Sequence, residues 1–499
     1  MAPIPVPKPW QCAGCSRLRA SLMGTSLASP SSQNPRSSGL TLCALAGVLA
    51  MVAATGLLWI SPWAFAAIAC IGAFVIAIAN PFYGLLTLCA ILPFDIYLGS
   101  LFVSELVLVS IFLGLCFHMH WSGRRWQSDS LIFLLILYWI CTASTVFVAV
   151  DKGAVLKAAM KLALMIGAAF YSDQITWDER KLRQFLILLA LATSLPALYG
   201  IFESMTGTSE TALDKLLHIV PTESALGAEQ ILRAHSTFRY VLEFGMYLAI
   251  QFSILAPVFV LGASRRIKPA VRWILGTVAS IELLALILSF ARSSWLGVAA
   301  GVLFLLVGML RRQKKLAVRL LVILAFAAVV AAPFAIKKAE SVSDFSGDLL
   351  RLSLWVRGSE VIAAHPLLGV GPNNLRYHMP MISLWGEDLP VGTLENLYLT
   401  VAAETGLLSL LILCAVFWGA IRRAFQAIPK AHSSLLATVE SGVGVALIAA
   451  MACGLTDPVL TSTQNGLLLF LLLGVQRSIH RNNCVSPGTL SSSQVREPA

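Results

Sequence analysis

Apolar runs of about 20 residues, separated by short polar segments, dominate the chain from Gly39 to Gln476. An α-helix needs about 20 residues to cross a hydrocarbon core about 30 Å thick. The pattern therefore predicts an all-α, polytopic transmembrane helical bundle of about 12–14 spans. We expect spans near 40–59, 62–80, 82–98, 102–119, 131–149, 153–171, 183–203, 240–262, 273–290, 294–310, 318–337, 396–420, 435–454 and 459–476.

The two ends of the chain differ from this membrane domain, which we place at 39–476. Residues 1–38 are rich in Pro, Ser and Gln, and residues 477–499 are rich in Ser and polar side chains. Both compositions are typical of disordered tails, and we expect both tails in the cytoplasm.

Composition supports the membrane assignment. Of the 499 residues, 58% are hydrophobic and 12% are charged, and the mean hydropathy is +0.80. A soluble domain carries about 25% charged residues, so a soluble enzyme is excluded. Cys12 and Cys15 form one CxxC motif with no second pair nearby, and a structural zinc site needs four ligands, so we expect no metal site.

The net charge of +11 comes from basic residues in short loops between apolar runs. This is the positive-inside pattern of membrane proteins, and we therefore expect no nucleic-acid partner. With fourteen spans and a cytoplasmic N-terminus, the basic loops fall on one side. Two long loops, 203–239 and 338–394, then lie on the other side, which is the periplasm in a bacterial inner membrane.

The segment from Asp348 to Gly406 is the most polar excursion of the membrane domain. It begins with an amphipathic helix, Leu349 to Ala364, in which Arg351, Trp355 and Ile362 share one side and Arg357 and Glu360 turn away. Pro366 is expected to end this helix, because the residue before a proline is pushed out of the α region. After a glycine-rich turn, the chain re-enters an apolar helix at Glu395 and Asn396. A long structured loop between spans is usually functional.

Several cations occur where a membrane protein rarely tolerates them. Lys157 and Lys161 share one face of a predicted span near its external end, where they indicate an anionic ligand, although Lys157 could also extend toward the interface. Arg292 lies at the external tip of a tight hairpin, where it binds a ligand or anchors the interface. Arg233 and Arg351 lie in the two external loops, and guanidinium groups are well suited to diphosphate recognition.

Five short motifs follow one another between residues 233 and 408. They are RAHSTF (233–238), SFARSSWLG (289–297), RLSLW (351–355), HPLLGVGPNN (365–374) and ENLYLTVAAETGLL (395–408). In this order and with this topology, the chain resembles the bacterial O-antigen ligase and polymerase superfamily over about 200–438.

The resemblance implies a glycosyl transfer that uses neither metal nor nucleotide cofactor. A glycan moves from an undecaprenyl-pyrophosphate carrier to an acceptor on the periplasmic face. Arg351 and Arg233 are expected to bind the donor diphosphate, with Arg292 nearby. The family's H-N-x-x-L motif falls on Glu395-Asn396-Leu397-Tyr398-Leu399, so Asn396 matches and Glu395 stands in place of the family histidine.

The sequence allows two interpretations of Glu395. A carboxylate with a raised pKa can serve as a general base toward the acceptor hydroxyl. Alternatively, Glu395 only complements the positive end of the helix dipole. The departure from histidine weakens a lipid A ligase assignment more than it weakens the superfamily.

These observations predict a polymerase of an exported polysaccharide in the bacterial inner membrane. A ligase that transfers the glycan to a lipid A core or a protein is the nearest alternative, and a membrane transporter is the alternative of another class. Expected partners are the lipid-linked donor, a glycan acceptor, the bilayer, a flippase and a chain-length regulator.

Overall fold

A computed structural model gives the fold of most of the chain. It describes residues 61–94, 96, 98, 101–127, 130–206, 225–226, 231–232, 234–238, 240–261, 269–310, 314, 317–318, 321, 346–379, 382–384, 387–389, 392–431 and 434–485. The predicted N-terminal tail and the predicted span 40–59 lie outside these residues, as does nearly all of the predicted span 318–337.

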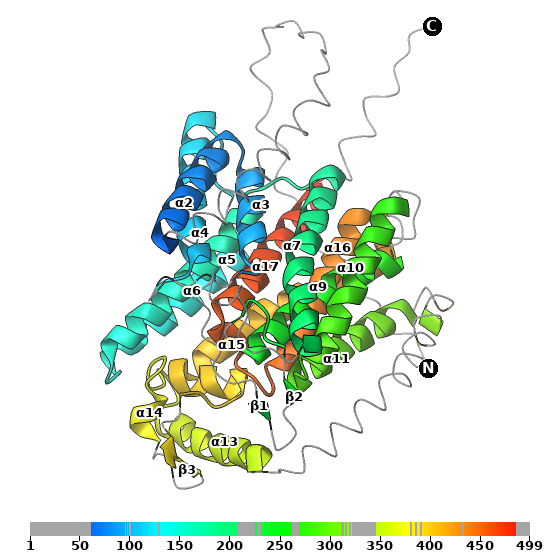
Figure 1. Ribbon diagram of the computed structural model, residues 1–499. Coiled ribbons are helices and arrows are strands. Elements are labelled where there is room, and N and C mark those ends of the chain that lie inside the picture. The colour runs from blue at the N-terminus through cyan, green and yellow to red at the C-terminus, as the bar shows by residue number, and fades with distance from the viewer. Residues whose placement is uncertain are drawn as a thin grey trace, which may run out of the picture. The chain divides into compact units, whose positions relative to one another are not determined.

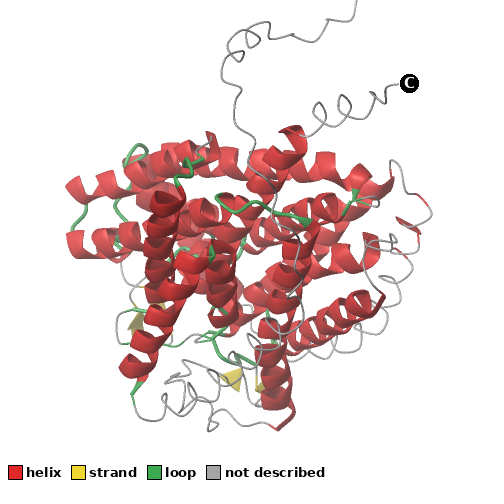
Figure 2. Cartoon of the chain, turned by 90° about the horizontal axis from the view of Figure 1, so that it is seen from above, coloured by secondary structure: helices red, strands yellow, loops and turns green. Residues whose placement is uncertain are grey.

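Helices make up most of the described chain (Figure 2). They are α2 (Pro62–Ala79), α3 (Pro81–Ile91), α4 (Val103–Ser122), α5 (Ser130–Ser144), α6 (Lys152–Asp173), α7 (Glu179–Thr206), α9 (Val241–Leu261), α10 (Pro269–Leu288), α11 (Arg292–Leu310), α13 (Ser346–Ala364), α14 (Leu375–His378), α15 (Leu397–Ala427), α16 (Leu435–Cys453) and α17 (Thr463–Val485). Single 3-10 turns are η1 (Thr145–Phe147), η2 (Ile428–Lys430) and η3 (Val459–Thr461). Two short antiparallel hairpins pair β1 (Ala225–Leu226) with β2 (Ile231–Leu232) and β3 (Ile382–Leu384) with β4 (Glu387–Leu389).

Nine helices in the described part of the chain are long and apolar enough to cross a membrane. They are α4, α5 with η1, α6, α7, α9, α10, α11, α15 with η2, and α16. Large apolar side chains such as Phe117, Phe133 and Met160 are exposed on these helices, as lipid-facing surfaces require. The predicted all-α polytopic bundle is confirmed, and the chain is a multi-pass membrane protein.

The predicted span 82–98 is wrong in extent. α3 ends at Ile91 and has 11 residues, which gives a length of about 17 Å. That is too short for a hydrocarbon core of about 30 Å. The apolar run continues into a buried turn that includes Leu92, so hydropathy alone overstated the helix.

The centre of the bundle is formed by α9 and α16, which are the most buried of the nine helices and pack against each other. α11 crosses α16 through two glycines, Gly297 and Gly301. A Cβ atom on Gly301 would lie 2.9 Å from the carbonyl oxygen of Val445, and one on Gly297 would overlap Sγ of Cys453. Small residues four apart therefore allow the backbones of α11 and α16 to approach closely.

One face of the bundle carries the long polar loop, and we call it the loop face. Figure 1 shows α13, α14 and the two hairpins at this end. Long-range bonds bring helix ends together there: Thr463 at the start of α17 donates to Glu105 in the first turn of α4, and Asn465 donates to the carbonyl of Glu243 in α9. The backbone N–H of Leu397, the first residue of α15, donates to Gly454 just after α16.

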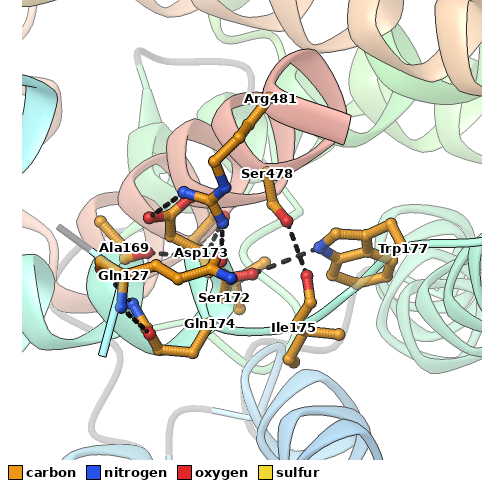
Figure 3. A network of polar contacts seen from close by, with 10 residues as sticks. Gln127, Ala169, Ser172, Asp173, Gln174, Ile175, Trp177, Ser478 and Arg481 are labelled. Carbon is orange, nitrogen blue, oxygen red and sulfur yellow. Dashed lines mark hydrogen bonds and ion pairs between the residues drawn. The ribbon is translucent and has the colours of Figure 1, made fainter. Parts of the chain in front are cut away.

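The opposite face collects basic side chains, and we call it the basic face. Figure 3 shows one contact on this face, an ion pair in which the single Nη1 atom of Arg481 lies 3.0 Å from each carboxylate oxygen of Asp173. Ser478 also donates to the carbonyl of Ile175 at 2.6 Å. These contacts join the end of α17 to the end of α6. The predicted end of the last span at 476 is therefore wrong, because the helix continues to Val485.

Candidate functional site

Helix α13 lies against the start of α15 on the loop face. It ends at Ala364, as Pro366 predicted. Its side chains Leu354 and Val361 are buried, and the indole Nε1 of Trp355 donates to the carbonyl of Leu394 at 2.9 Å. Gly358 permits this approach, because a Cβ there would clash with the side chain of Leu394. Helix α13 is therefore fixed to the residue that precedes Glu395.

Arg351 is partly buried and lies one helical turn before Trp355, on the same side of α13. The tie between Trp355 and Leu394 thus places Arg351 on the side of α13 that faces the start of α15. Arg357, predicted to turn away, is only partly exposed, and its Nη1 atom is buried. Glu360 is exposed, as the periodicity predicted.

The glycine-rich turn after α13 fits into a break in α15. Gly406 has non-helical dihedrals (φ 86°, ψ 164°) in the middle of the helix. Pro366 accepts a hydrogen bond from Leu407, and a Cβ on Gly406 would collide with the carbonyl of Leu367. The loop and the broken helix are therefore two halves of one packed unit.

The same turn is held by hydrogen bonds to Glu404. The backbone N–H groups of Gly371 and Asn373 donate to the carbonyl and to Oε1 of Glu404, both at 2.8 Å. Asn374 then docks on the start of α6, where it accepts from the N–H of Asp151 at 2.7 Å. Arg376 forms an ion pair with the Asp151 carboxylate at 3.1 Å.

Two histidines border this turn. The imidazole rings of His365 and His378 meet edge to face at 5.4 Å between centroids. Partial burial, and then the charge of His365, lower the pKa of His378. His378 is therefore neutral at pH 7, and Arg376 carries the positive charge of α14.

Glu395 has an unusual backbone and a partly buried side chain. Its φ of 48° lies in the left-handed region, which costs a non-glycine residue about 1–3 kcal/mol. Its N–H donates to Thr393 Oγ1 at 3.2 Å, and Thr393 Oγ1 lies 3.3 Å from the Glu395 carboxylate. The surrounding segment is fixed on both sides, so the strained position is maintained.

Asn396, expected to bind substrate, is the N-cap of α15. Its Oδ1 accepts from the N–H groups of Tyr398 and Leu399 at 2.9 and 3.0 Å. Its Nδ2 donates to the carbonyl of Leu455 at 2.8 Å. The side chain thus joins the start of α15 to the segment after α16, which gives it a clear structural role.

The other predicted cations are spread over the loop face. Lys157 is exposed on α6, and the partly buried Lys161 places Nζ 5.5 Å from the ring centroid of Phe102. Arg292 is exposed at the first position of α11. Arg233 lies outside the described residues.

Sequence reasoning missed a buried acid–base pair between α7 and the RAHSTF motif. Nε2 of His235 lies 2.9 Å from Oε1 of Glu203, and both side chains are almost completely buried. The other oxygen of Glu203 accepts from the N–H groups of His235 and Ser236. The two partners are 32 residues apart, so no local pattern pointed to the pair; only the glutamate at the end of a span was a signal.

Asp457 was missed as well. It is buried on the loop face just after α16, and its N–H donates to the carbonyl of Cys453. The Gly-Leu-Thr-Asp-Pro sequence after an apolar run was the available signal, because an acid at the end of a span is uncommon.

Left-handed backbone marks the motifs quoted above. Among the described residues, the non-glycine residues with positive φ are Ser236, Phe290, Asn373 and Glu395. Each belongs to a different motif: RAHSTF, SFARSSWLG, HPLLGVGPNN and ENLYLT respectively. Such strain clusters at functional sites because the surrounding structure must enforce it.

Contacts connect these motifs into one continuous arc on the loop face. Phe238 packs on Phe244 and Tyr247 of α9. The next residue of α9, Gly245, lies so close to Ala291 that a Cβ would come within 2.6 Å. Further along α11, Gly297 lies against Cys453 at the end of α16. The carbonyl of the next residue, Gly454, accepts from the N–H of Leu397. The arc therefore connects RAHSTF and SFARSSWLG to the start of α15, and α13 packs against the start of α15 as well.

Comparison with known proteins agrees with this arrangement. Residues 275–414, from α10 to the middle of α15, match the family model described as O-Antigen ligase. No curated protein matches the chain in a sequence search. The match contains SFARSSWLG, α13, the glycine-rich turn and Glu395, and it supports the resemblance drawn from the motifs.

Proposed function

We propose that the protein polymerises undecaprenyl-pyrophosphate-linked repeat units of an exported polysaccharide on the periplasmic face of the inner membrane. The observation that carries the proposal is Glu395, a partly buried carboxylate on a left-handed backbone directly before the N-cap of α15. The family match to O-Antigen ligase supports membrane glycosyl transfer as the reaction class.

In the proposed reaction, Glu395 accepts the proton of an acceptor hydroxyl. The hydroxyl oxygen attacks the anomeric carbon of the donor glycan, and a new glycosidic bond forms. The bond between that carbon and the pyrophosphate oxygen breaks, and undecaprenyl pyrophosphate leaves with the bonding electrons. A positioned base contributes about 10²–10⁴ in rate.

Arginines on the loop face are proposed to stabilise the leaving pyrophosphate. Arg351 is the first candidate, because the bond from Trp355 to Leu394 fixes its helix beside the segment of Glu395. Arg233 and Arg292 belong to motifs of the same arc, and charge-assisted bonds from arginine suit a diphosphate. Lys157 and Lys161 extend the same positive character along α6, and Asn396 holds the start of α15 in place.

Two other functions remain as candidates. A ligase that transfers the glycan to a lipid A core or a protein uses the same donor, and Glu395 in place of histidine favours the polymerase over it. A transporter is favoured by no observation on the loop face, since its polar groups would concentrate at the midplane of the spans. A flippase that delivers the donor and a chain-length regulator are the proposed partners of the polymerase.

Polymer assays on variants of Glu395 test the proposal. Glu395→Gln keeps the shape and removes the base, so polymer yield normalised to membrane expression should fall at least about 100-fold. Glu395→His should retain measurable yield, because histidine titrates near pH 6.5 and can accept the same proton. A fully active Glu395→Gln protein would contradict the base.

Variants of Arg351 test the donor site in the same assay. Arg351→Ala should lower polymer yield at least about tenfold, since a charge-assisted bond contributes about 1.5–3 kcal/mol. Arg351→Lys should restore it only in part, because a point charge cannot form a two-pronged contact. Glu360→Ala on the exposed side of the same helix is the matched control and should leave the yield unchanged.

A further inference from the structure

A second cluster of charged side chains lies on the basic face, at the opposite ends of the helices that form the candidate site. Arg423 comes from the last turns of α15, Lys430 from η2, Glu440 from α16, and Arg477 and His480 from α17. Glu440 interacts electrostatically with Arg423 and Lys430, and His480 interacts with Arg423, Lys430 and Arg477. These five residues therefore form one cluster, which we call the basic cluster.

The helices of the basic cluster are held together directly beneath it. Gln476 of α17 donates through Nε2 to the carbonyl of Ala420 in α15 at 3.0 Å and to the carbonyl of Glu440 in α16 at 3.2 Å. His480 Nδ1 lies 2.9 Å from Oε1 of Glu440. The spacing between the three helices is thus fixed by bonds that do not involve the arginines.

Positive charge exceeds negative charge in the basic cluster. Among the five residues of the basic cluster, Arg423, Lys430 and Arg477 are permanent cations and Glu440 is the one carboxylate; its Oε1 already contacts His480. The neighbouring acid on this face, Asp173, is taken by Arg481 through both of its oxygens. Arg423 and Arg477 are partly buried, and positive charge removed from water is costly unless an anion compensates it.

Arg423 shows where such an anion would bind. Its Nε and Nη2 atoms are buried and have no hydrogen-bond partner among the described residues. These two atoms form one edge of the guanidinium group, the edge that presents two parallel N–H groups to a phosphate or carboxylate. A buried donor without an acceptor costs about 1–3 kcal/mol, so this edge has a strong requirement for a ligand.

The location indicates a lipid as the source of the anion. On α15, the outward side chains Leu411 and Trp418 are 66% and 69% exposed, and Arg422 follows on the same side. An acyl chain can lie along this apolar surface while its headgroup reaches the end of the helix. Basic sites between helices on the cytoplasmic side of membrane proteins are suited to anionic headgroups.

We propose that the basic cluster binds the phosphate group of an anionic membrane phospholipid, with the Nε and Nη2 edge of Arg423 as its two-pronged contact. Lys430, exposed at the rim, adds charge to the same phosphate. The site is separate from the proposed glycosyl-transfer site, because the two lie at opposite ends of α15.

The test uses the full-length protein in an uncharged detergent, titrated with phosphatidylglycerol and, separately, with inorganic phosphate. Binding is followed by native mass spectrometry and by the lipid-induced rise in melting temperature. We expect phosphatidylglycerol to bind and to raise the melting temperature, and inorganic phosphate at matched concentration to do neither. An equal effect of inorganic phosphate would overturn the lipid in favour of a soluble anion.

Arg423→Gln is expected to weaken phosphatidylglycerol binding about tenfold or more. Arg422→Gln is the matched control: it removes the same charge from the adjacent, exposed position and should weaken binding no more than about threefold. Equal losses in the two variants would show an unspecific basic surface and overturn the site.

Lys430→Gln is a second test variant that should not disturb folding, because Lys430 is exposed. It should weaken binding about fivefold, as loss of one cation near a headgroup predicts. Size-exclusion profiles and melting temperatures without lipid should match those of the wild type. Unchanged lipid binding in both Arg423→Gln and Lys430→Gln would overturn the proposal.

Discussion

Asn374 and Asp151, which are 223 residues apart in the sequence, are joined by two hydrogen bonds. The N–H of Asp151 donates to Asn374 Oδ1 at 2.7 Å, and Asn374 Nδ2 donates to the carbonyl of Asp151 at 3.3 Å. This reciprocal pair joins the long polar loop to the start of α6, beside the ion pair of Arg376 with the Asp151 carboxylate. The loop is therefore fixed at α6 as well as at α15.

Replacing Asn374 should loosen that attachment. Asn374→Ala removes the acceptor of the partly buried Asp151 N–H and one of two donors to the Asp151 carbonyl, which also accepts from Val155, and should cost about 1–2 kcal/mol of stability. Thermal unfolding of the purified protein in detergent measures the loss. Asn373→Gly is the control: the neighbouring side chain is exposed, and glycine adopts its φ of 59° without strain. Equal melting temperatures for Asn374→Ala and the wild type would contradict the tie.

Gly406 should tolerate no side chain. At its φ of 86°, a Cβ is strained and collides with the carbonyl of Leu367, so Gly406→Ala should destabilise the protein by more than about 3 kcal/mol. Gly419→Ala in the same helix is the matched control, since the nearest atom to its Cβ would be Arg423 Nη1 at 3.5 Å. There alanine should stabilise the helix by up to about 1 kcal/mol. Similar unfolding curves for the two variants would refute the packed break.

The local patterns of the sequence predicted what local physics determines. Pro366 predicted the end of α13 at Ala364, and the apolar run predicted a span from 396, one residue before α15 begins at Leu397. The break at Gly406 was not predicted, because a glycine within an apolar helix pattern is ordinary. It is visible only when the loop that fills it is in place.

What the sequence could not supply were pairings between distant elements. The composition predicted that Arg481 belongs to a polar tail. In the structure Arg481 lies in α17 and forms an ion pair with Asp173, which is 308 residues earlier. The pair of Glu203 and His235 is hidden in the same way. Periodicity reports which side of a helix is apolar, but it does not report which buried charge will meet which partner.

The sidedness of the loop face can be tested by cysteine labelling. In a background without the ten native cysteines, Ser359→Cys on α13 should react with an impermeant thiol reagent in intact spheroplasts. Ser122→Cys at the end of α4 is the matched control and should react only after the membrane is disrupted. Both serines are exposed, and each donates to the carbonyl three residues earlier. The reverse order of labelling would invert the proposed topology.

Two buried glutamates should respond oppositely to the same substitution. Both carboxylate oxygens of Glu282 in α10 are buried and have no hydrogen-bond partner among the described residues. Glu282→Met should therefore leave stability unchanged or raise it. Glu105→Met should lower stability by about 2 kcal/mol, because Glu105 accepts from the N–H of Phe102 and from Thr463. Thermal unfolding of the two variants measures both changes in stability. A destabilised Glu282→Met protein would show that the Glu282 carboxyl makes a favourable contact.

Glu395→Gly separates the catalytic from the structural interpretation of Glu395. Glycine adopts a φ of 48° at no steric cost, so the substitution relieves strain that costs glutamate about 1–3 kcal/mol. The melting temperature should therefore be maintained or raised. If Glu395 is the base, polymer yield should nevertheless fall by about 10²–10⁴.

Polymer yield separates the two interpretations, because relief of the backbone strain stabilises the protein under either one. If Glu395 only complements the dipole of α15, its removal costs up to about 1 kcal/mol, which the relieved strain offsets, and polymer formation stays intact. Asn373→Gly, which relieves the same kind of strain at an exposed position of the loop face, controls for the effect of glycine on the loop. A Glu395→Gly protein that is stable and fully active would exclude the carboxylate from the reaction, whereas one that is stable and inactive, beside an active Asn373→Gly protein, assigns a catalytic role to the carboxylate.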